Sequence, residues 1–128
     1  MDDREKKQTG RRGEDEACRY LEEHGHHIIE RNWRSGHLEI DIITIDKDGL
    51  HFVEVKSRKA PATADPEVGL DWKKQRHIVS AAGKYLRDET RKSAPGMEIF
   101  FDAVTVLFDG DEVLQLNYYP QAYIPIYT

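Results

Sequence analysis

Two consecutive apolar stretches of the chain contain acids and a lysine. "LEIDIITI" (38–45) includes Asp41, and "LHFVEVKS" (50–57) includes Glu54 and Lys56. Strand side chains alternate between faces, so Glu54 and Lys56 point the same way. The linking "DKDG" is typical of a hairpin turn, which brings Asp41 and Glu54 to the same level of the ladder. Cross-strand neighbours lie about 5 Å apart, so this spacing predicts that both carboxylates reach one cation.

Two carboxylates at that spacing repel each other unless a proton or a cation lies between them. No set of histidines and cysteines has zinc spacing, and oxygen ligands favour a hard ion. We therefore expect Mg²⁺ or Mn²⁺ at Asp41 and Glu54, where it polarises a phosphoryl oxygen and activates a water. Lys56 is expected to stabilise charge developing on the phosphate. The alternative for an isolated Glu-x-Lys is an ordinary surface pair.

Two helices are expected to complete this site. "GEDEACRYLEEHG" predicts a helix from about Glu14 to His24 that ends at Gly25, with Glu14 on its inward face as an extra ligand or base. The second helix, "WKKQRHIVSAAGKYLRDE", carries the polar Gln75 on its apolar stripe, and Lys74 lies beside it as a phosphate contact. The buried face of that helix is expected to include Trp72, Val79, Ala82 and Leu86.

The remaining apolar runs predict three more strands, giving the element order α-β-β-β-α-β-β. This order indicates an α/β fold with a central mixed five-stranded sheet flanked by helices. The 128 residues fit a single domain, 1–128. Residues 1–12 are expected to be flexible, and residues 117–128 to form an extended, docked tail.

Composition favours a soluble, charge-rich protein, with 38% hydrophobic and 34% charged residues. There is no apolar run of membrane-spanning length and no secretory signal. Cys18 is the sole cysteine, which excludes an intramolecular disulfide and favours a reducing, cytoplasmic setting. The net charge of −5 argues mildly against a nucleic-acid partner, but clusters of basic residues offset it. Solvated faces also produce such clusters.

Four segments together resemble the YraN-type family of small bacterial proteins: "GEDEACRYLEEHG", "LEIDIITIDKDGLHFVEVKSRK", "DWKKQRHIVSAAGKYL" and "FFDAVTVL". The resemblance runs from about Arg12 to Leu107. The family is similar in turn to the PD-(D/E)XK nucleases, including archaeal Holliday-junction resolvases, which implies a restriction endonuclease-like core. Two departures are Ile40, where the superfamily has proline, and Leu38, where family members usually have glycine.

The resemblance also implies roles for individual residues. Asp41 and Glu54 match the two motif acids, Lys56 the motif lysine, and Glu14 the helix glutamate near the metal. The other matches are an acid just before the motif aspartate, a helix pair and a late strand acid, which correspond to Glu39, Lys74-Gln75 and Asp102.

Three functions follow from these patterns. The first is a metal-dependent endonuclease that hydrolyses DNA, including branched repair or recombination intermediates. Its expected nucleic-acid contacts are Lys74, Gln75, Arg58 and Arg12. The second is a non-catalytic nucleic-acid-binding module on a nuclease fold. The third is a protein-interaction module that uses the tyrosine-rich tail. Junction resolution needs two paired active sites, so a homodimer is the expected assembly for the first.

Overall fold

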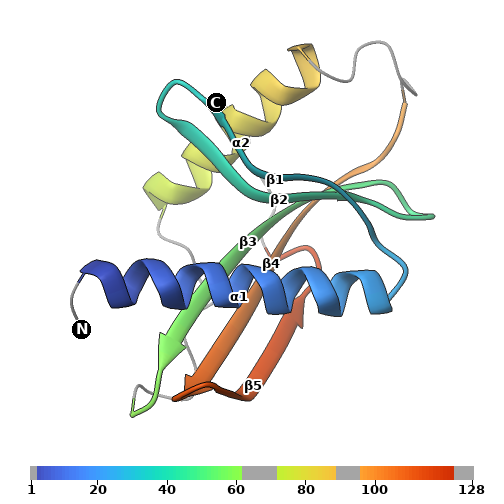
Figure 1. The fold of residues 1–128 in the computed structure, drawn as a ribbon. Coiled ribbons are helices and arrows are strands. Elements are labelled where there is room, and N and C mark those ends of the chain that lie inside the picture. The colour runs from blue at the N-terminus through green and yellow to red at the C-terminus, as the bar shows by residue number, and fades with distance from the viewer. Residues whose placement is uncertain (1–2, 62–71, 89–95, 123–128) are drawn as a thin grey trace.

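The first helix, α1 (Asp3–Glu23), lies across one face of the sheet in a computed structural model that describes residues 3–61, 72–88 and 96–122 (Figure 1). The predicted helix start near Glu14 is wrong, because α1 begins at Asp3 and residues 3–12, which were expected to be flexible, are helical. Small residues recur every fourth position, at Thr9, Gly13 and Ala17, and form a buried stripe that lets the helix approach the sheet closely. Packing along this stripe stabilises a polar segment that has weak helical signals of its own.

A Schellman motif ends α1. Gly25 has a φ of 90°, its N–H donates to the Glu22 carbonyl at 3.3 Å, and the His26 N–H donates to the Leu21 carbonyl at 2.9 Å. Glycine adopts this left-handed conformation without steric cost, which confirms Gly25 as the predicted stop. The motif also fixes the direction in which the chain leaves the helix, and it places His26 against the end of the sheet.

Five strands form one mixed sheet in the order β1-β2-β3-β4-β5. They are β1 (His27–Ser35), β2 (Leu38–Ile45), β3 (Leu50–Lys59), β4 (Ile99–Asp109) and β5 (Glu112–Tyr119). β3 and β4 are parallel, with α2 (Trp72–Asp88) between them in sequence, and the other neighbours are antiparallel. The predicted α/β class, five-stranded mixed sheet and element order are confirmed. Of the predicted tail, residues 117–119 belong to β5, and residues 123–128 lie outside the described residues.

Each helix covers one face of the sheet, which gives two apolar cores. On the α1 side, Ala17 and Leu21 pack against Ile42, Val53 and other sheet residues. The core on the α2 side joins residues of that helix to the sheet: Ile40, Ile43, Leu50, Phe52, Ile78, Ala81, Ala82, Tyr85 and Phe101. No helix in the described ranges is long and apolar enough to cross a membrane.

The buried stripe of α2 lies further along the helix than expected. Ala82 is buried as predicted, and Val79 and Leu86 are partly buried against the core. Trp72 was predicted to be buried but is 53% exposed, because it stands at the first residue of the helix, before the buried stripe begins at Ile78. The first turn of α2 therefore extends beyond the apolar core.

β2 and β3 pair only near their shared turn. Their register runs from Ile45 opposite Leu50 to Ile42 opposite Val53 and then stops. Beyond that point β2 continues alongside β1, while β3 continues alongside β4. The next residues in the two strands, Asp41 and Glu54, stand where the strands separate.

Candidate functional site

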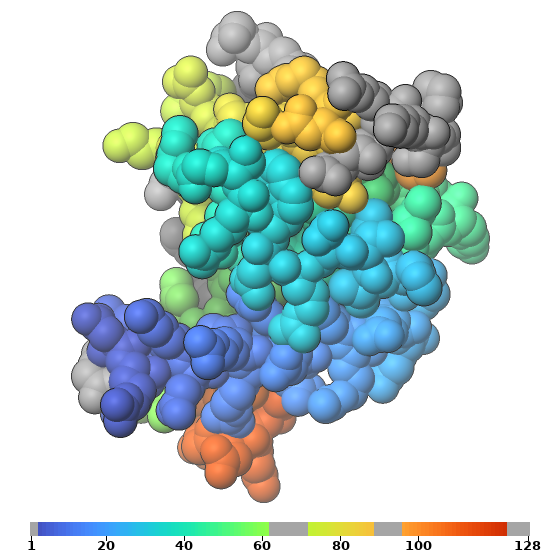
Figure 2. All heavy atoms as spheres, turned by 45° about the horizontal axis from the view of Figure 1, so that its top comes forward, coloured from blue at the N-terminus to red at the C-terminus, as the bar shows by residue number. Residues whose placement is uncertain are grey.

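A pocket of about 350 Å³ lies where β2 and β3 separate, against the first turns of α2. The space-filling view shows the surface hollowed on the side where the first half of α1 approaches the start of α2 (Figure 2). The two strands supply the acids of the pocket, and α2 supplies lysines and a histidine. Its lining residues are His37, Glu39, Ile40, Asp41, Val53, Glu54, Lys73, Lys74, His77 and Ile78.

Glu54 lies at the inner wall of this pocket and is only 4% exposed. The Lys74 ammonium is 2.8 Å from Glu54 Oε1, which makes an ion pair. Even so, neither carboxylate oxygen accepts a hydrogen bond of good geometry from any residue that the structure describes. A buried carboxylate ordinarily has its oxygens hydrogen-bonded, so Glu54 has coordinating capacity that the protein leaves unused.

The Asp41 side chain bonds to β3 where the β2–β3 ladder ends. Its Oδ2 accepts a hydrogen bond from the Val55 N–H at 2.9 Å, so a side chain replaces the missing strand carbonyl. Burial raises the pKa of the Asp41 carboxyl to about 7, and the charges of Glu14 and Glu54 act in the same direction, against the Val55 hydrogen bond. Asp41 therefore exchanges its proton near neutral pH while no cation is bound.

Glu14 approaches this region from α1. Asn32 Nδ2 donates to Glu14 Oε1 at 3.0 Å, which holds the carboxylate against β1. Burial raises the pKa of Glu14, although the Asn32 hydrogen bond and Arg31 oppose the rise. Glu14 is close enough to raise the pKa of Asp41 by its charge, but it does not line the pocket.

Three other predicted residues, Lys56, Arg58 and Gln75, are not among the residues that line the pocket. Lys56 is half-buried two residues beyond Glu54 on the same face of β3. Gln75 is half-buried on α2 beside Lys74. Arg58 is exposed, and its guanidinium donates to the Ser57 carbonyl at 3.0 Å. Glu39 lines the rim, with its Oε1 3.4 Å from the Arg34 guanidinium.

Two predicted residues make contacts elsewhere. The Arg12 guanidinium lies 4.3 Å from the centre of the Phe108 ring and donates to the Gly110 carbonyl at 3.1 Å. These contacts tie α1 to the β4–β5 turn. Asp102 is 1% exposed and accepts hydrogen bonds from His51, Tyr118 and Gln121, so it belongs to a different network from Asp41 and Glu54.

The acids of the pocket do not form a three-ligand cage. Among residues 3–61, 72–88 and 96–122, one group of at least three potential metal ligands has its ligand atoms within 4.8 Å of one another, and its members are His26, Asp46 and His51. Sequence reasoning missed this group. His51 is buried. Its position on β3, alternating with Glu54, was the signal that could have placed it on the α1 face.

Hydrogen bonds within that group set the protonation of its two rings. Burial opposes a charge on His51, but hydrogen bonds to Asp102 and Asp46 raise its pKa above the usual value. Burial, reinforced by the neighbouring His51, lowers the pKa of His26. The two imidazoles therefore differ in their pKa. Burial favours the neutral form of His26, whereas the two carboxylates beside His51 favour its charged form.

Comparison with known proteins shows which family this chain is similar to. A profile of the uncharacterised protein family UPF0102 matches residues 13–106. A UPF0102 protein of Bacteroides thetaiotaomicron is 35% identical over 121 residues, which cover 94% of this chain and 96% of the relative. One from Rhodococcus jostii is 37% identical over 114 residues, covering 89% and 94%. One from Parabacteroides distasonis is 46% identical over 78 residues, covering 61% and 64%. The chain therefore belongs to the uncharacterised protein family UPF0102, the YraN family, whose signatures its sequence carries.

Proposed function

We propose that this protein is a metal-dependent nuclease that hydrolyses phosphodiester bonds of DNA at the pocket between β2, β3 and α2. The observation that carries the proposal is the Glu54 carboxylate, which is 4% exposed and accepts no hydrogen bond of good geometry from a described residue. A second carboxylate, Asp41, lines the same pocket and is close enough for the Glu54 charge to raise its pKa. Unused buried oxygens beside a second acid are what a divalent cation requires.

The donor set fits a hard ion. Asp41 and Glu54 offer only oxygen atoms, and Mg²⁺ or Mn²⁺ is commonly held by one or two carboxylates, with water and phosphate completing the shell. These two residues would hold the ion. When bound, it supplies Lewis-acid polarisation of a phosphoryl oxygen and a water of lowered pKa.

The chain's own residues prepare the pocket for a polyanion. The Val55 N–H fixes the Asp41 carboxylate in orientation. The Lys74 side chain pairs with Glu54 at its tip while remaining 56% exposed, so its ammonium stands between the buried acid and the solvent. The neighbouring Lys73 is also exposed and lines the same pocket, so two ammonium groups lie where a phosphate would bind. These two lysines reduce the repulsion that the carboxylates exert on DNA.

The resemblance to PD-(D/E)XK nucleases supports the same assignment. In that comparison Asp41, Glu54 and Lys56 match the motif residues, and the confirmed element order α-β-β-β-α-β-β agrees with the core that it implies. On this basis Lys56, on the same face of β3 as Glu54, stabilises negative charge on the phosphate.

The test is a cleavage panel of single-stranded, duplex, flap and four-way-junction DNA with Mg²⁺ or Mn²⁺. Glu54→Gln and Lys56→Met are compared with Glu112→Gln, a matched carboxylate-to-amide change at an exposed acid of β5 that does not line the pocket. We expect a loss of about 100-fold or more in rate for the first two, as typical for charged groups that act in the transition state. Cleavage by Glu54→Gln at the wild-type rate, from a preparation free of contaminating nuclease, refutes the assignment.

One observation favours the non-catalytic alternative. The Lys74–Glu54 ion pair neutralises the buried acid without an ion, as a module that only binds DNA requires. That module binds the same DNA panel with a salt-dependent affinity and cleaves none of it with either metal. The panel therefore separates the two functions.

A further inference from the structure

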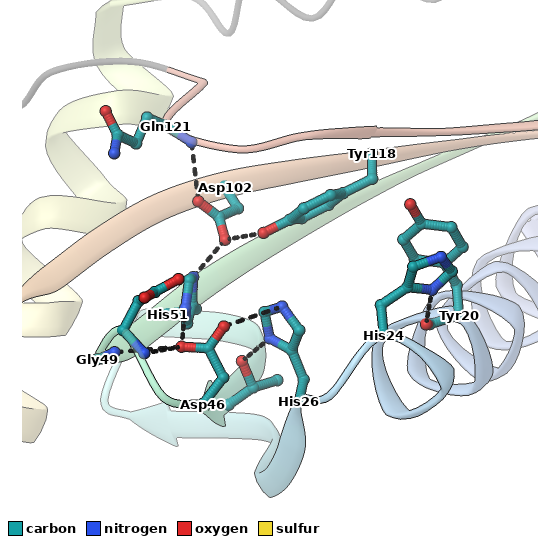
Figure 3. A network of polar contacts seen from close by, with 11 residues as sticks. Tyr20, His24, His26, Asp46, Gly49, His51, Asp102, Tyr118 and Gln121 are labelled. Carbon is teal, nitrogen blue, oxygen red and sulfur yellow. Dashed lines mark hydrogen bonds and ion pairs between the residues drawn. The ribbon is translucent and has the colours of Figure 1, made fainter.

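A second polar cluster lies at the C-terminal end of α1 (Figure 3). His26 follows the cap of that helix, Asp46 occupies the β2–β3 turn, and His51 is on β3. His51 and Glu54 are three residues apart on one strand, so alternation directs their side chains to opposite faces. This cluster takes no part in the function proposed above and does not depend on it.

The facing atoms of this cluster have the spacing of metal ligands. His51 Nε2 is 2.9 Å from Asp46 Oδ1, and His26 Nε2 is 3.6 Å from Asp46 Oδ2. One ligand atom from each residue lies within 4.8 Å of the other two. In a tetrahedral site with bonds of about 2.0–2.1 Å, ligand atoms stand about 3.3 Å apart. The two observed separations lie on either side of that value.

Both imidazoles are oriented by their other nitrogen. His26 Nδ1 is 2.7 Å from the Thr44 hydroxyl, and His51 Nδ1 is 2.6 Å from Asp102 Oδ2. Asp102 is held in turn by the Tyr118 hydroxyl at 2.6 Å. Metal-binding histidines characteristically use the second nitrogen in this way, because an outer carboxylate or hydroxyl fixes the ring and its tautomer. The Nε2 atoms of both rings are consequently directed at Asp46.

Asp46 is also fixed in advance. Its Oδ1 accepts the backbone N–H groups of Asp48 at 2.9 Å and Gly49 at 3.1 Å, which leaves Oδ2 on the His26 side. The Asp46 side chain is 13% exposed, whereas those of His26 and His51 are 5% and 7% exposed. The cluster is therefore closed on the histidine side and reaches solvent beside Asp46, through which an ion can enter.

From this geometry we infer that His26, Asp46 and His51 bind one divalent transition-metal ion of the zinc class. Two imidazoles and a carboxylate favour such an ion over Mg²⁺, which prefers oxygen ligands. His26 Nε2, His51 Nε2 and a carboxylate oxygen of Asp46 are the ligands, and a water fills the fourth position. Binding displaces the proton between His51 Nε2 and Asp46 and releases it to solvent. The ion joins the end of α1, the hairpin turn and β3 in one linkage.

The same distances also suit a hydrogen-bonded network that holds a proton and no metal. Co²⁺ distinguishes the two, since it substitutes for Zn²⁺ in nitrogen-rich four-coordinate sites with intense visible absorption, while all-oxygen sites absorb weakly. The titration uses the full chain carrying Glu54→Gln, so that the pocket between β2 and β3 contributes little. We expect one Co²⁺ per chain, displaced by one Zn²⁺, and a rise in Tm with Zn²⁺.

Two variants remove ligands and keep the local hydrogen bonds. His26→Asn retains a polar atom for Thr44 but deletes Nε2, and Asp46→Asn retains an acceptor for the turn but loses the charge. His77→Gln, at an exposed histidine on α2, is the matched control. We expect both variants to weaken Co²⁺ binding about tenfold or more, and His77→Gln to leave it unchanged. Circular dichroism reports whether each variant is folded.

Three results overturn the inference. The first is a titration of the parent chain without intense visible absorption. The second is absorption that persists in folded His26→Asn or Asp46→Asn, or that disappears in His77→Gln. The third is an unchanged Tm of the parent chain in excess Zn²⁺. This measurement needs no ligand variant, so it applies even where such a variant does not fold.

Discussion

Substituting Asp41 by asparagine should stabilise the metal-free protein, and increasingly so as the pH rises. The asparagine side chain has almost the same shape as the aspartate and can still accept the Val55 N–H through its carbonyl oxygen. It lacks the negative charge that burial and the neighbouring acids Glu14 and Glu54 disfavour. The substitution therefore removes an electrostatic cost while it keeps the contact that positions the side chain.

The magnitude follows from the difference between the folded and unfolded pKa. The folded value of Asp41 is about 7, and its ordinary value is 3.8. Because the folded pKa is the higher one, the contribution of protonated Asp41 to stability is fully present below pH 3.8. That contribution is lost as the pH rises through 7. Linkage gives a loss of about 2 kcal/mol at pH 5 and about 4 kcal/mol at pH 8, relative to the protonated state. The advantage of Asp41→Asn should thus grow by about 2–3 kcal/mol over this range.

Urea unfolding followed by circular dichroism measures this advantage, in chelator at several pH values between about 5 and 8, the range over which linkage predicts the change. Glu39→Gln is the matched control, because its side chain is 42% exposed at the rim of the same pocket. The free energy of unfolding of Glu39→Gln, relative to that of the wild type, should change little over the same pH range. A stability difference between wild type and Asp41→Asn that stays constant across these pH values refutes the reasoning.

Two further substitutions test the packing that positions the two sites. Tyr118→Phe deletes the hydroxyl that donates to Asp102 at 2.6 Å, and it should lower the free energy of unfolding by about 1–2 kcal/mol. An unchanged urea midpoint contradicts that role. Gly13→Ala places a Cβ in overlap with Ser57 Oγ and 2.9 Å from Ser57 Cβ, so α1 must move away from β3, at a cost of about 1–3 kcal/mol. Adding Ser57→Gly should recover most of that loss in thermal unfolding, and a double variant no more stable than Gly13→Ala would argue against the contact.

Local patterns in the sequence predicted the sheet well, but they predicted the start of α1 and the buried face of α2 less well. Alternation and an Asp-Gly turn specify the β2–β3 hairpin, and Gly25 specifies the end of α1. The start of α1 could not be predicted in this way, because residues 3–12 are polar and their helix is stabilised by contact with β3 through Gly13. Trp72 was misplaced for a related reason: its size suggests burial, but the helix begins before the sheet is there to cover it.

The acids of the pocket are easier to predict from the sequence than the cluster of His26, Asp46 and His51. Asp41 and Glu54 come from consecutive strands, so hairpin spacing alone predicts that they lie close together. What spacing could not predict is that the ladder stops at Ile42 and Val53, which opens the pocket and leaves Glu54 without hydrogen bonds of good geometry from the described residues. The strands separate because β2 stays paired with β1 while β3 stays paired with β4. Pairing over the whole sheet therefore determines where the ladder stops.

The cluster of His26, Asp46 and His51 depends on three separate local features. The Schellman cap of α1 directs His26 toward the sheet, the turn fixes the Asp46 carboxylate through two backbone N–H groups, and alternation turns His51 away from Glu54. Each feature is recognisable by itself, but no motif spacing joins a helix cap to a turn. Their meeting requires the end of α1 to lie beside the hairpin turn, a contact between elements that only the assembled fold supplies. A ligand search restricted to motif spacing therefore finds sites built by one hairpin and misses those built where a helix ends against a sheet.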